Sequence, residues 1–164
     1  MSDRFFLDTN IFVYSFDQSA PAKARRAAQL IREALTTQKG VISYQVVQEF
    51  FNVALKRFSK PMQAADAGQY LIAVFRPLLA VHSSQALYAE ALFLHAQSGL
   101  SQEGISWYDS LIVSAAIQAR CEILFSEDLQ HGRRFGSLAV RILFFKCTGS
   151  MLWPFESLEV SPYQ

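Results

Sequence analysis

The chain has 164 residues, enough for one domain with a hydrophobic core and too few for two. A net charge of +1, with 51% hydrophobic and 18% charged residues, excludes a disordered chain and argues against a polybasic nucleic-acid binder. The two cysteines, Cys121 and Cys147, stand far apart without a metal-binding spacing, which argues against a disulfide framework or a zinc site. We therefore expect a protein of the reducing cytoplasm.

Membrane segments are not expected either. The longest apolar stretches, residues 70–81 and 138–145, are interrupted by Arg76 and Arg141 and fall short of the ~20 residues of a membrane-spanning helix. The first residues show neither the apolar core nor the cleavage site of a signal peptide. The high aromatic content, with 14 Phe and 6 Tyr, suggests instead that some apolar surface serves a protein partner.

The first expected element is a buried strand, Phe5–Leu7, which ends directly at Asp8. Ligands of open α/β sheets bind at the carboxyl ends of strands, so Asp8 is a candidate site residue. A short helix is expected over residues 10–16 and a second from Pro21 to about Thr37. The basic residues of the second helix are interpreted as a solvated face rather than as a phosphate track.

The middle of the chain predicts a strand at Val41-Ile42 and a helix for which Ser43 can serve as the cap. Apolar residues cover a broad face of this helix as far as Phe58, whereas Gln45 and Glu49 share its polar side. Taken alone, Glu49 would be an ordinary exposed glutamate.

The second half of the chain is expected to add three helices and two strands. These are a helix from Pro61 to about Phe75, ended by Arg76-Pro77, a strand at Leu78–Val81, a helix from Ser83 or Ser84 to about Gly99, a helix at Trp107–Arg120 and a strand at Glu122–Ser126. Asp109 lies in the first turn of the last helix, where a carboxylate is favourable in its own right, and Asp128 could simply form a turn after the last strand. The alternation of strands and helices predicts an α/β fold with a mostly parallel sheet.

Four acidic residues would then meet at one edge of the sheet. Asp8 and Asp128 follow strand ends, Asp109 begins a helix, and Glu49 can point to the same edge. Two carboxylates ~4 Å apart repel by ~4 kcal/mol at an effective dielectric constant of about 20, so several cannot converge without protons or a cation. Because all the candidate ligands are oxygens, Mg²⁺ or Mn²⁺ is expected rather than zinc.

Four segments of the chain carry a resemblance to a known family. They are Leu7-Asp8-Thr9-Asn10, Val47-Gln48-Glu49-Phe50, Trp107-Tyr108-Asp109-Ser110-Leu111-Ile112 and Leu124-Phe125-Ser126-Glu127-Asp128-Leu129-Gln130-His131-Gly132. In this order and spacing they resemble the PIN-domain ribonucleases, in particular toxins of the VapC type from toxin–antitoxin pairs. The resemblance covers residues 1 to about 140.

The resemblance implies a PIN-like three-layer α/β/α sandwich and a metal-dependent endoribonuclease. It places the acidic quartet of the family at Asp8, Glu49, Asp109 and Asp128, with Ser126 as the small polar residue before the last acid and Asn10 as the residue that helps to hold the first. A metal ion held by the three aspartates, with Glu49 orienting a ligand water or a second ion, would activate water for attack on a phosphodiester.

The resemblance also implies partners, namely an RNA substrate, a small inhibitory antitoxin and a second copy in a homodimer. Arg133 and Arg134 could contact the RNA backbone, although a solvated surface pair is an equal alternative. The chain departs from the family after about residue 139, where an expected last strand, Val140–Lys146, leads into an unexplained tail. We therefore divide the chain into a PIN-like nuclease domain at 1–140 and a C-terminal strand with an atypical tail at 141–164.

Two other functions fit parts of the pattern. A phosphatase of the haloacid dehalogenase type also begins with a strand that ends in Asp, but its chemistry needs a second Asp two residues later, where this chain has Asn10. The main alternative is a catalytically silent PIN-like module that binds RNA or protein. The presence of all four acids favours the enzyme, and the sequence does not identify its RNA.

Overall fold

A six-stranded sheet forms the centre of the computed structural model, which describes residues 3–99 and 104–144. The strands are β1 (Phe5–Leu7), β2 (Gly40–Ser43), β3 (Leu79–Val81), β4 (Ile123–Phe125), β5 (Arg134–Phe135) and β6 (Leu138–Arg141). Their order across the sheet is β3-β2-β1-β4-β6-β5, and every neighbouring pair is parallel except β5 and β6.

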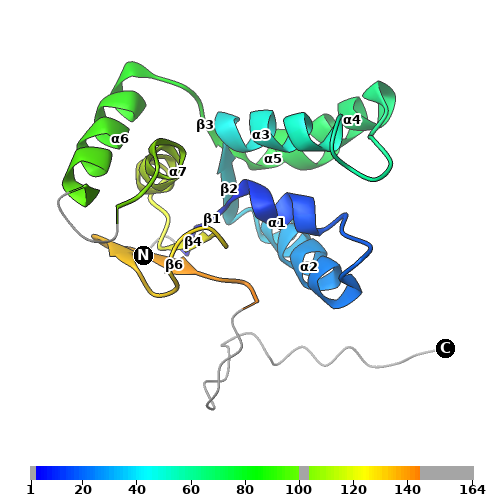
Figure 1. Ribbon diagram of the computed structural model, residues 1–164, viewed down its shortest axis with the longest axis horizontal. Coiled ribbons are helices and arrows are strands. Elements are labelled where there is room, and N and C mark those ends of the chain that lie inside the picture. Colours follow the sequence, from blue (N-terminus) through cyan, green and yellow to red (C-terminus); the bar gives the residue numbers. More distant parts are fainter. Residues whose placement is uncertain (1–2, 100–103, 145–164) are drawn as a thin grey trace, which may run out of the picture.

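Helices cover both faces of this sheet (Figure 1). They are α1 (Thr9–Tyr14), α2 (Pro21–Thr37), α3 (Tyr44–Ala54), α4 (Ala64–Tyr70), the π-helix η1 (Leu71–Phe75), α5 (Arg76–Leu78), α6 (Gln85–Ser98) and α7 (Trp107–Gln118). In Figure 1, α2 lies on one face of the sheet and α6 and α7 lie on the other. The expected three-layer α/β/α fold with a mostly parallel sheet is therefore confirmed.

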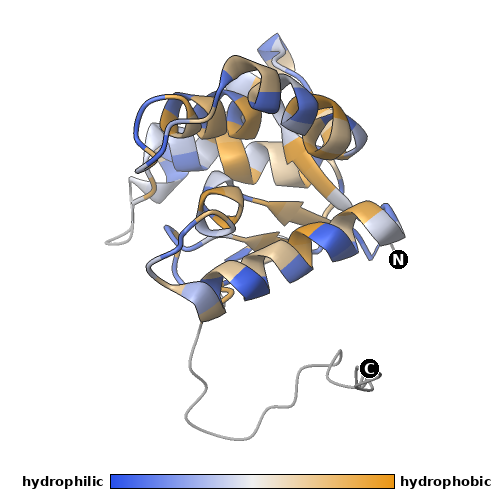
Figure 2. Cartoon of the chain, turned by 90° about the vertical axis from the view of Figure 1, so that its right-hand side faces the viewer, coloured by the Kyte–Doolittle hydropathy of each residue, from blue (hydrophilic) through white to orange (hydrophobic). Residues whose placement is uncertain are grey.

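The central strands consist almost entirely of apolar residues because both of their faces are covered. Phe6, Leu7, Ile42 and Leu124 have no exposed surface, and Figure 2 shows the hydrophobic strands between more polar helices. The registers Phe6↔Val41 and Leu7↔Phe125 align the strands, so the carboxyl ends of β1 and β4 meet at one edge. This edge presents the residues that follow the two strands, Asp8 among them.

The region after Ser43 differs from the prediction. Ser43 precedes α3 but makes no capping bond, and its hydroxyl is buried without a partner among the described residues. The helix ends at Ala54 rather than near Phe58, and the next helix starts at Ala64 rather than near Pro61.

Pro77 was expected to end a helix, and this prediction was wrong. Pro77 lies inside the short helix α5, which directly follows the π-helix η1. At the junction, the N–H of Arg76 donates to the carbonyl of Leu71, five residues earlier. In a regular helix the proline ring clashes with the carbonyl four residues earlier, and the wider π turn relieves this clash. The chain thus stays helical until β3.

One large group of aromatic side chains packs in the core around Phe50. Phe50 has no exposed surface and lies within 5.1 to 6.5 Å, between ring centroids, of six other rings. These belong to Phe12, Phe16, Phe51, Phe58, Tyr70 and Phe75. Such edge-to-face and stacked pairs each add about 0.5–1.5 kcal/mol to the burial of their surface.

The last part of the sheet is a hairpin that the sequence did not predict. The antiparallel strand β5 pairs with β6, which begins at Leu138 and ends at Arg141 instead of running to Lys146. Residues 145–164, with Cys147 and the end of the expected strand, lie outside the described residues, and the division of the chain at residue 140 stays a prediction. No helix in the described part of the chain is both long and apolar enough to cross a membrane.

Candidate active site

Asp8 is held at the carboxyl end of β1 by groups from the start of α1 and from the end of β4. Its side chain accepts hydrogen bonds from the N–H of Thr9 at 2.7 Å and from Ser126 Oγ at 2.6 Å, and its own N–H donates to the carbonyl of Phe125. Asp8 is only 5% exposed, and burial raises its pKa to about 7 although both hydrogen bonds oppose the shift. The charges of Asp128 and Glu49 raise this pKa further. Hydrogen bonds to shared residues connect Asp8 to both, through Ser126 to Asp128 and through Thr9 to Glu49.

Asp128 shares its support with Asp8. Ser126 Oγ accepts a hydrogen bond from the N–H of Asp128 at 3.3 Å, so one serine bonds to both acids, and its supporting role in the site stays a prediction. Asn10 Nδ2 donates to Asp128 Oδ2 at 3.2 Å, whereas the resemblance assigned Asn10 to the first acid, Asp8. The start of α1 thus orients the acid that follows β4.

Glu49 is oriented by two residues that the sequence did not single out. Thr9 Oγ1 donates to Glu49 Oε2 and Gln45 Nε2 donates to Glu49 Oε1, both at 2.7 Å. Gln45 was expected on a polar helix face, but it is only 4% exposed and its Nε2 also reaches the carbonyl of Tyr108 at 3.3 Å. Gln45 therefore connects α3 to the first turn of α7.

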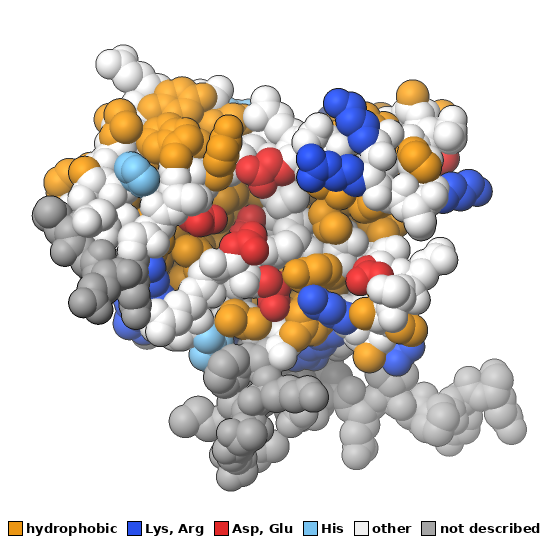
Figure 3. All heavy atoms as spheres, in the orientation of Figure 1, with side chains coloured by type: hydrophobic (Ala, Val, Ile, Leu, Met, Phe, Trp, Pro, Cys, Tyr) orange, Lys and Arg blue, Asp and Glu red, His pale blue; other side chains and the backbone are white. Residues whose placement is uncertain are grey.

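Asp109 stands somewhat apart from the other three acids. Ser106 caps α7, its Oγ donates to Asp109 Oδ2 at 2.7 Å, and the N–H of Asp109 donates back to Ser106 Oγ at 3.0 Å. Asp109 is not among the charges that raise the pKa of Asp8. Figure 3 shows acidic side chains gathered in the middle of one face of the molecule.

The donor atoms of this site fit a divalent cation that keeps part of its water. As the side chains stand, the described residues contain no group of three His, Cys, Asp or Glu that could hold one ion. Mg²⁺, however, usually takes only one or two carboxylates directly. Asn10 Oδ1 is buried beside Asp128 and has no hydrogen-bond partner in the described part of the chain, so it offers a further oxygen to a cation or its water.

The family model of the PIN domain matches residues 5–134. The chain belongs to the PIN domain family. This confirms the family resemblance seen in the sequence, and no match is found among curated proteins.

Solved structures of toxin–antitoxin proteins share the fold of this PIN domain. The FitAB complex bound to a DNA fragment is 18% identical with a TM-score of 0.59, and the match covers 76% of this chain and 85% of that one. VapBC2 of Rickettsia felis, bound to a promoter DNA fragment, is 19% identical with a TM-score of 0.57, covering 84% and 96%. VapC20 of Mycobacterium tuberculosis, described as a sarcin-ricin loop cleaving toxin, is 16% identical with a TM-score of 0.53, covering 76% and 91%.

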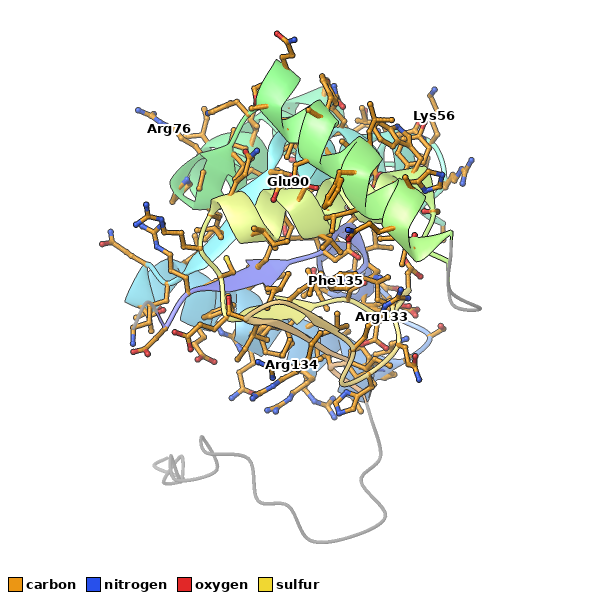
Figure 4. The ribbon with its side chains drawn as sticks, turned by 90° about the vertical axis from the view of Figure 1, so that its left-hand side faces the viewer. Lys56, Arg76, Glu90, Arg133, Arg134 and Phe135 are labelled. Carbon is orange, nitrogen blue, oxygen red and sulfur yellow. The ribbon has the colours of Figure 1, made fainter. Side chains whose placement is uncertain are left out.

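The two arginines predicted to contact RNA lie on the β5–β6 hairpin of the PIN domain (Figure 4). Arg134 is in register with Ala139, which pairs with Ile123, the first residue of β4. The acids follow the opposite end of that strand, so the structure does not bring Arg134 to them. The guanidinium of Arg133 lies 5.1 Å from the ring centre of Phe135, a cation–π contact within the hairpin.

Replacing Thr9 with Val is expected to destabilise the PIN domain by about 1.5–3 kcal/mol, because the substitution removes a hydrogen bond to the carboxylate of Glu49 at nearly constant volume. Urea unfolding at neutral pH measures this change. Thr36→Val is the matched control, since the exposed Thr36 hydroxyl bonds only to the carbonyl of Arg32. Equal midpoints for the two variants would contradict the importance of the Thr9–Glu49 bond.

Proposed function

We propose that this PIN domain is a metal-dependent endoribonuclease and the toxin of a toxin–antitoxin pair. The observation that carries the proposal is the pair Asp8 and Asp128, which one serine holds at the carboxyl edge of a parallel sheet, with Glu49 close enough to raise the pKa of Asp8. Such a concentration of carboxylates destabilises the protein unless a cation compensates it. The sarcin-ricin loop cleaving activity named for VapC20 supports RNA as the substrate.

The residues of this site would bind and orient rather than react covalently. Bound here, Mg²⁺ or Mn²⁺ would polarise the scissile phosphate and lower the pKa of a water. Thr9 and Ser126 hold the carboxylate of Asp8 in one orientation. Asn10 orients the carboxylate of Asp128 in the same way. We assign cation binding to these two aspartates together with Asp109 at the rim of the site.

Glu49 would orient the attacking water. Thr9 and Gln45 fix one lone pair on each of its carboxylate oxygens, and the remaining lone pairs are available to accept a proton from water. The resemblance to the family implies cleavage to a 5′-phosphate and a 3′-hydroxyl, which requires that water attacks the phosphorus and that the 3′ oxygen leaves with a proton.

Two protein partners belong to the proposal: a small antitoxin and a second copy of this chain. The solved complexes FitAB and VapBC2 support the first. Exposed apolar side chains on α6 and at the start of α7 support a partner surface, and Figure 3 shows an apolar group beside the acidic one. These side chains are Tyr88, Leu92, Phe93 and Tyr108.

One observation favours the alternative, a catalytically silent module that binds RNA or protein. The described carboxylates are not arranged as ligands of one ion. Metal-binding calorimetry distinguishes the two functions, because a silent module needs no divalent cation whereas the nuclease binds one without RNA.

The test of the proposal is incubation of the purified protein with total cellular RNA, with Mg²⁺ or Mn²⁺ and with a chelator in parallel. Mapping of new 5′ ends by sequencing is expected to show discrete cuts only when the metal is present. Cuts that persist in the chelator would contradict the metal dependence. No cuts together with no heat of metal binding would favour the silent module.

A further inference from the structure

One strip of the sheet is incompletely covered on the face that α2 occupies. On β6, Leu138 and Val140 point away from α2 and are fully buried. Arg141 points to the face that α2 occupies and is partly exposed. On β4, Leu124 is buried but Ile123 is partly exposed on the same side as Arg141. Figure 1 shows α2 beneath the β1–β2 side of the sheet and, in the described part of the chain, no helix beneath β6.

A hollow of about 430 Å³ lies along this strip. Its floor is apolar and is formed by Phe5, Ile123, Phe125 and Leu143, and one face of α2 from Arg26 to Thr37 forms its wall. The volume falls in the range of about 300–1,000 Å³ that is typical of pockets for ligands and anchoring side chains. Four basic residues are part of the lining, namely Arg4, Arg26, Lys39 and Arg141, against three acidic ones. Lys39 forms an ion pair with one of these acids, Asp3, at 2.9 Å.

The described chain ends beside this hollow. Leu143 lines it, and the ring of Phe144 lies 5.6 Å from the ring of Tyr14 and 4.7 Å from Lys23 Nζ. After β6 the chain has therefore already crossed to the side of α1 and α2.

The sequence of residues 145–164 is long enough for the hollow and suits it in hydrophobicity and charge. The wall from Arg26 to Thr37 is about 16 Å long at 1.5 Å per residue, and about five extended residues, fewer than this segment contains, span that length. Large apolar residues are concentrated at 151–160, and beyond residue 146 the only charged side chains are Glu156 and Glu159. Two carboxylates and no cation complement a lining that carries four basic and three acidic residues.

We propose that residues 151–160 of this chain occupy the hollow and complete the cover of the sheet. The apolar residues, with Trp153 as the largest, lie on the floor of Phe5, Ile123 and Phe125, and the two glutamates face Arg26 and its basic neighbours. This assigns a structural role to the atypical tail. The proposal is independent of the nuclease function, since none of the four acids of the candidate site lines the hollow.

Trp153 is the reporter that tests this proposal in the full-length chain. With Trp107 replaced by Phe, Trp153 is the only tryptophan. Because a buried indole is shielded from solvent, its quenching by acrylamide is expected to be about threefold weaker in the native protein than in urea. Arg26→Glu, which places a repelling charge at the rim, is expected to raise the native quenching about twofold.

Arg25→Glu is the matched control, because Arg25 is the exposed neighbour of Arg26 on α2 and does not line the hollow. Circular dichroism checks that each variant is folded. If Arg26→Glu does not fold, a double variant, Glu156→Lys with Glu159→Lys, tests the same contact from the side of the tail. Equal quenching in the native protein and in urea would overturn the proposal, as would identical responses to the Arg25 and Arg26 substitutions. Protection that disappears on dilution would overturn it in favour of the tail of a second copy.

Discussion

Asp8→Asn is expected to reduce RNA cleavage about 10³-fold or more while the fold is retained. The substitution removes a full negative charge from the centre of the proposed cation site and hardly changes the volume of the side chain. The hydrogen bonds can be kept, because Asn Oδ1 still accepts from the N–H of Thr9 and Asn Nδ2 can donate to Ser126 Oγ. The loss would therefore report the charge rather than a local collapse.

The measurement compares the cleavage rates of the wild type and the variant on the RNA that the sequencing experiment identifies, at saturating Mg²⁺ or Mn²⁺. Asp66→Asn is the control, since Asp66 is exposed in the first turn of α4 and is not part of the site. This control is expected to cut at the wild-type rate. If Asp8→Asn produces the same ends at the same rate, a contaminating nuclease explains the cuts and the silent module becomes the better function.

The positions of the acids could be predicted from sequence because they follow from strand ends and a helix start. An apolar run that stops at Asp8, and another that stops shortly before Asp128, place both residues at the carboxyl edge of the parallel sheet. Ser126, by contrast, was assigned only through the resemblance to the family. The family match then confirmed the fold on which this reasoning depends.

The hydrogen bonds that orient the acids could not be predicted in the same way. Gln45 lies four residues before Glu49 and follows the polar spacing of the helix, but helical periodicity does not reveal that α7 covers this side. Thr9 and Asn10 are neighbours that bond to acids 40 and 118 residues away, and such partners depend on tertiary packing. The π-helix before Pro77 and the strand β5 also escaped prediction, because each is short and lacks its own periodic pattern.

The stability of the metal-free protein is expected to fall as the pH rises from about 4 to about 7, in part because of Asp8. Its pKa is about 7 in the folded protein and near the ordinary 3.8 in the unfolded chain. Below about pH 4 both states carry the proton, so Asp8 has no effect. Between the two values only the folded state keeps it, the unfolded state binds fewer protons, and stability is lost with increasing pH. A shift of about three units corresponds to about 4 kcal/mol at most.

Asp8→Asn removes the pH-dependent contribution of Asp8 to the free energy of unfolding. The variant is therefore expected to be as stable as the wild type near pH 4 and more stable by a few kcal/mol near pH 8. Urea unfolding in the presence of a chelator at several pH values measures the difference in unfolding free energy between the variant and the wild type. The contributions of the other acids are nearly the same in both proteins and largely cancel in this difference. A difference that does not change with pH would mean that Asp8 is ionised in the folded protein at low pH as well. Adding Mg²⁺ or Mn²⁺ near pH 8 is expected to stabilise the wild type more than the variant, because a cation that binds only the folded protein stabilises it and the variant lacks one of the proposed ligand charges.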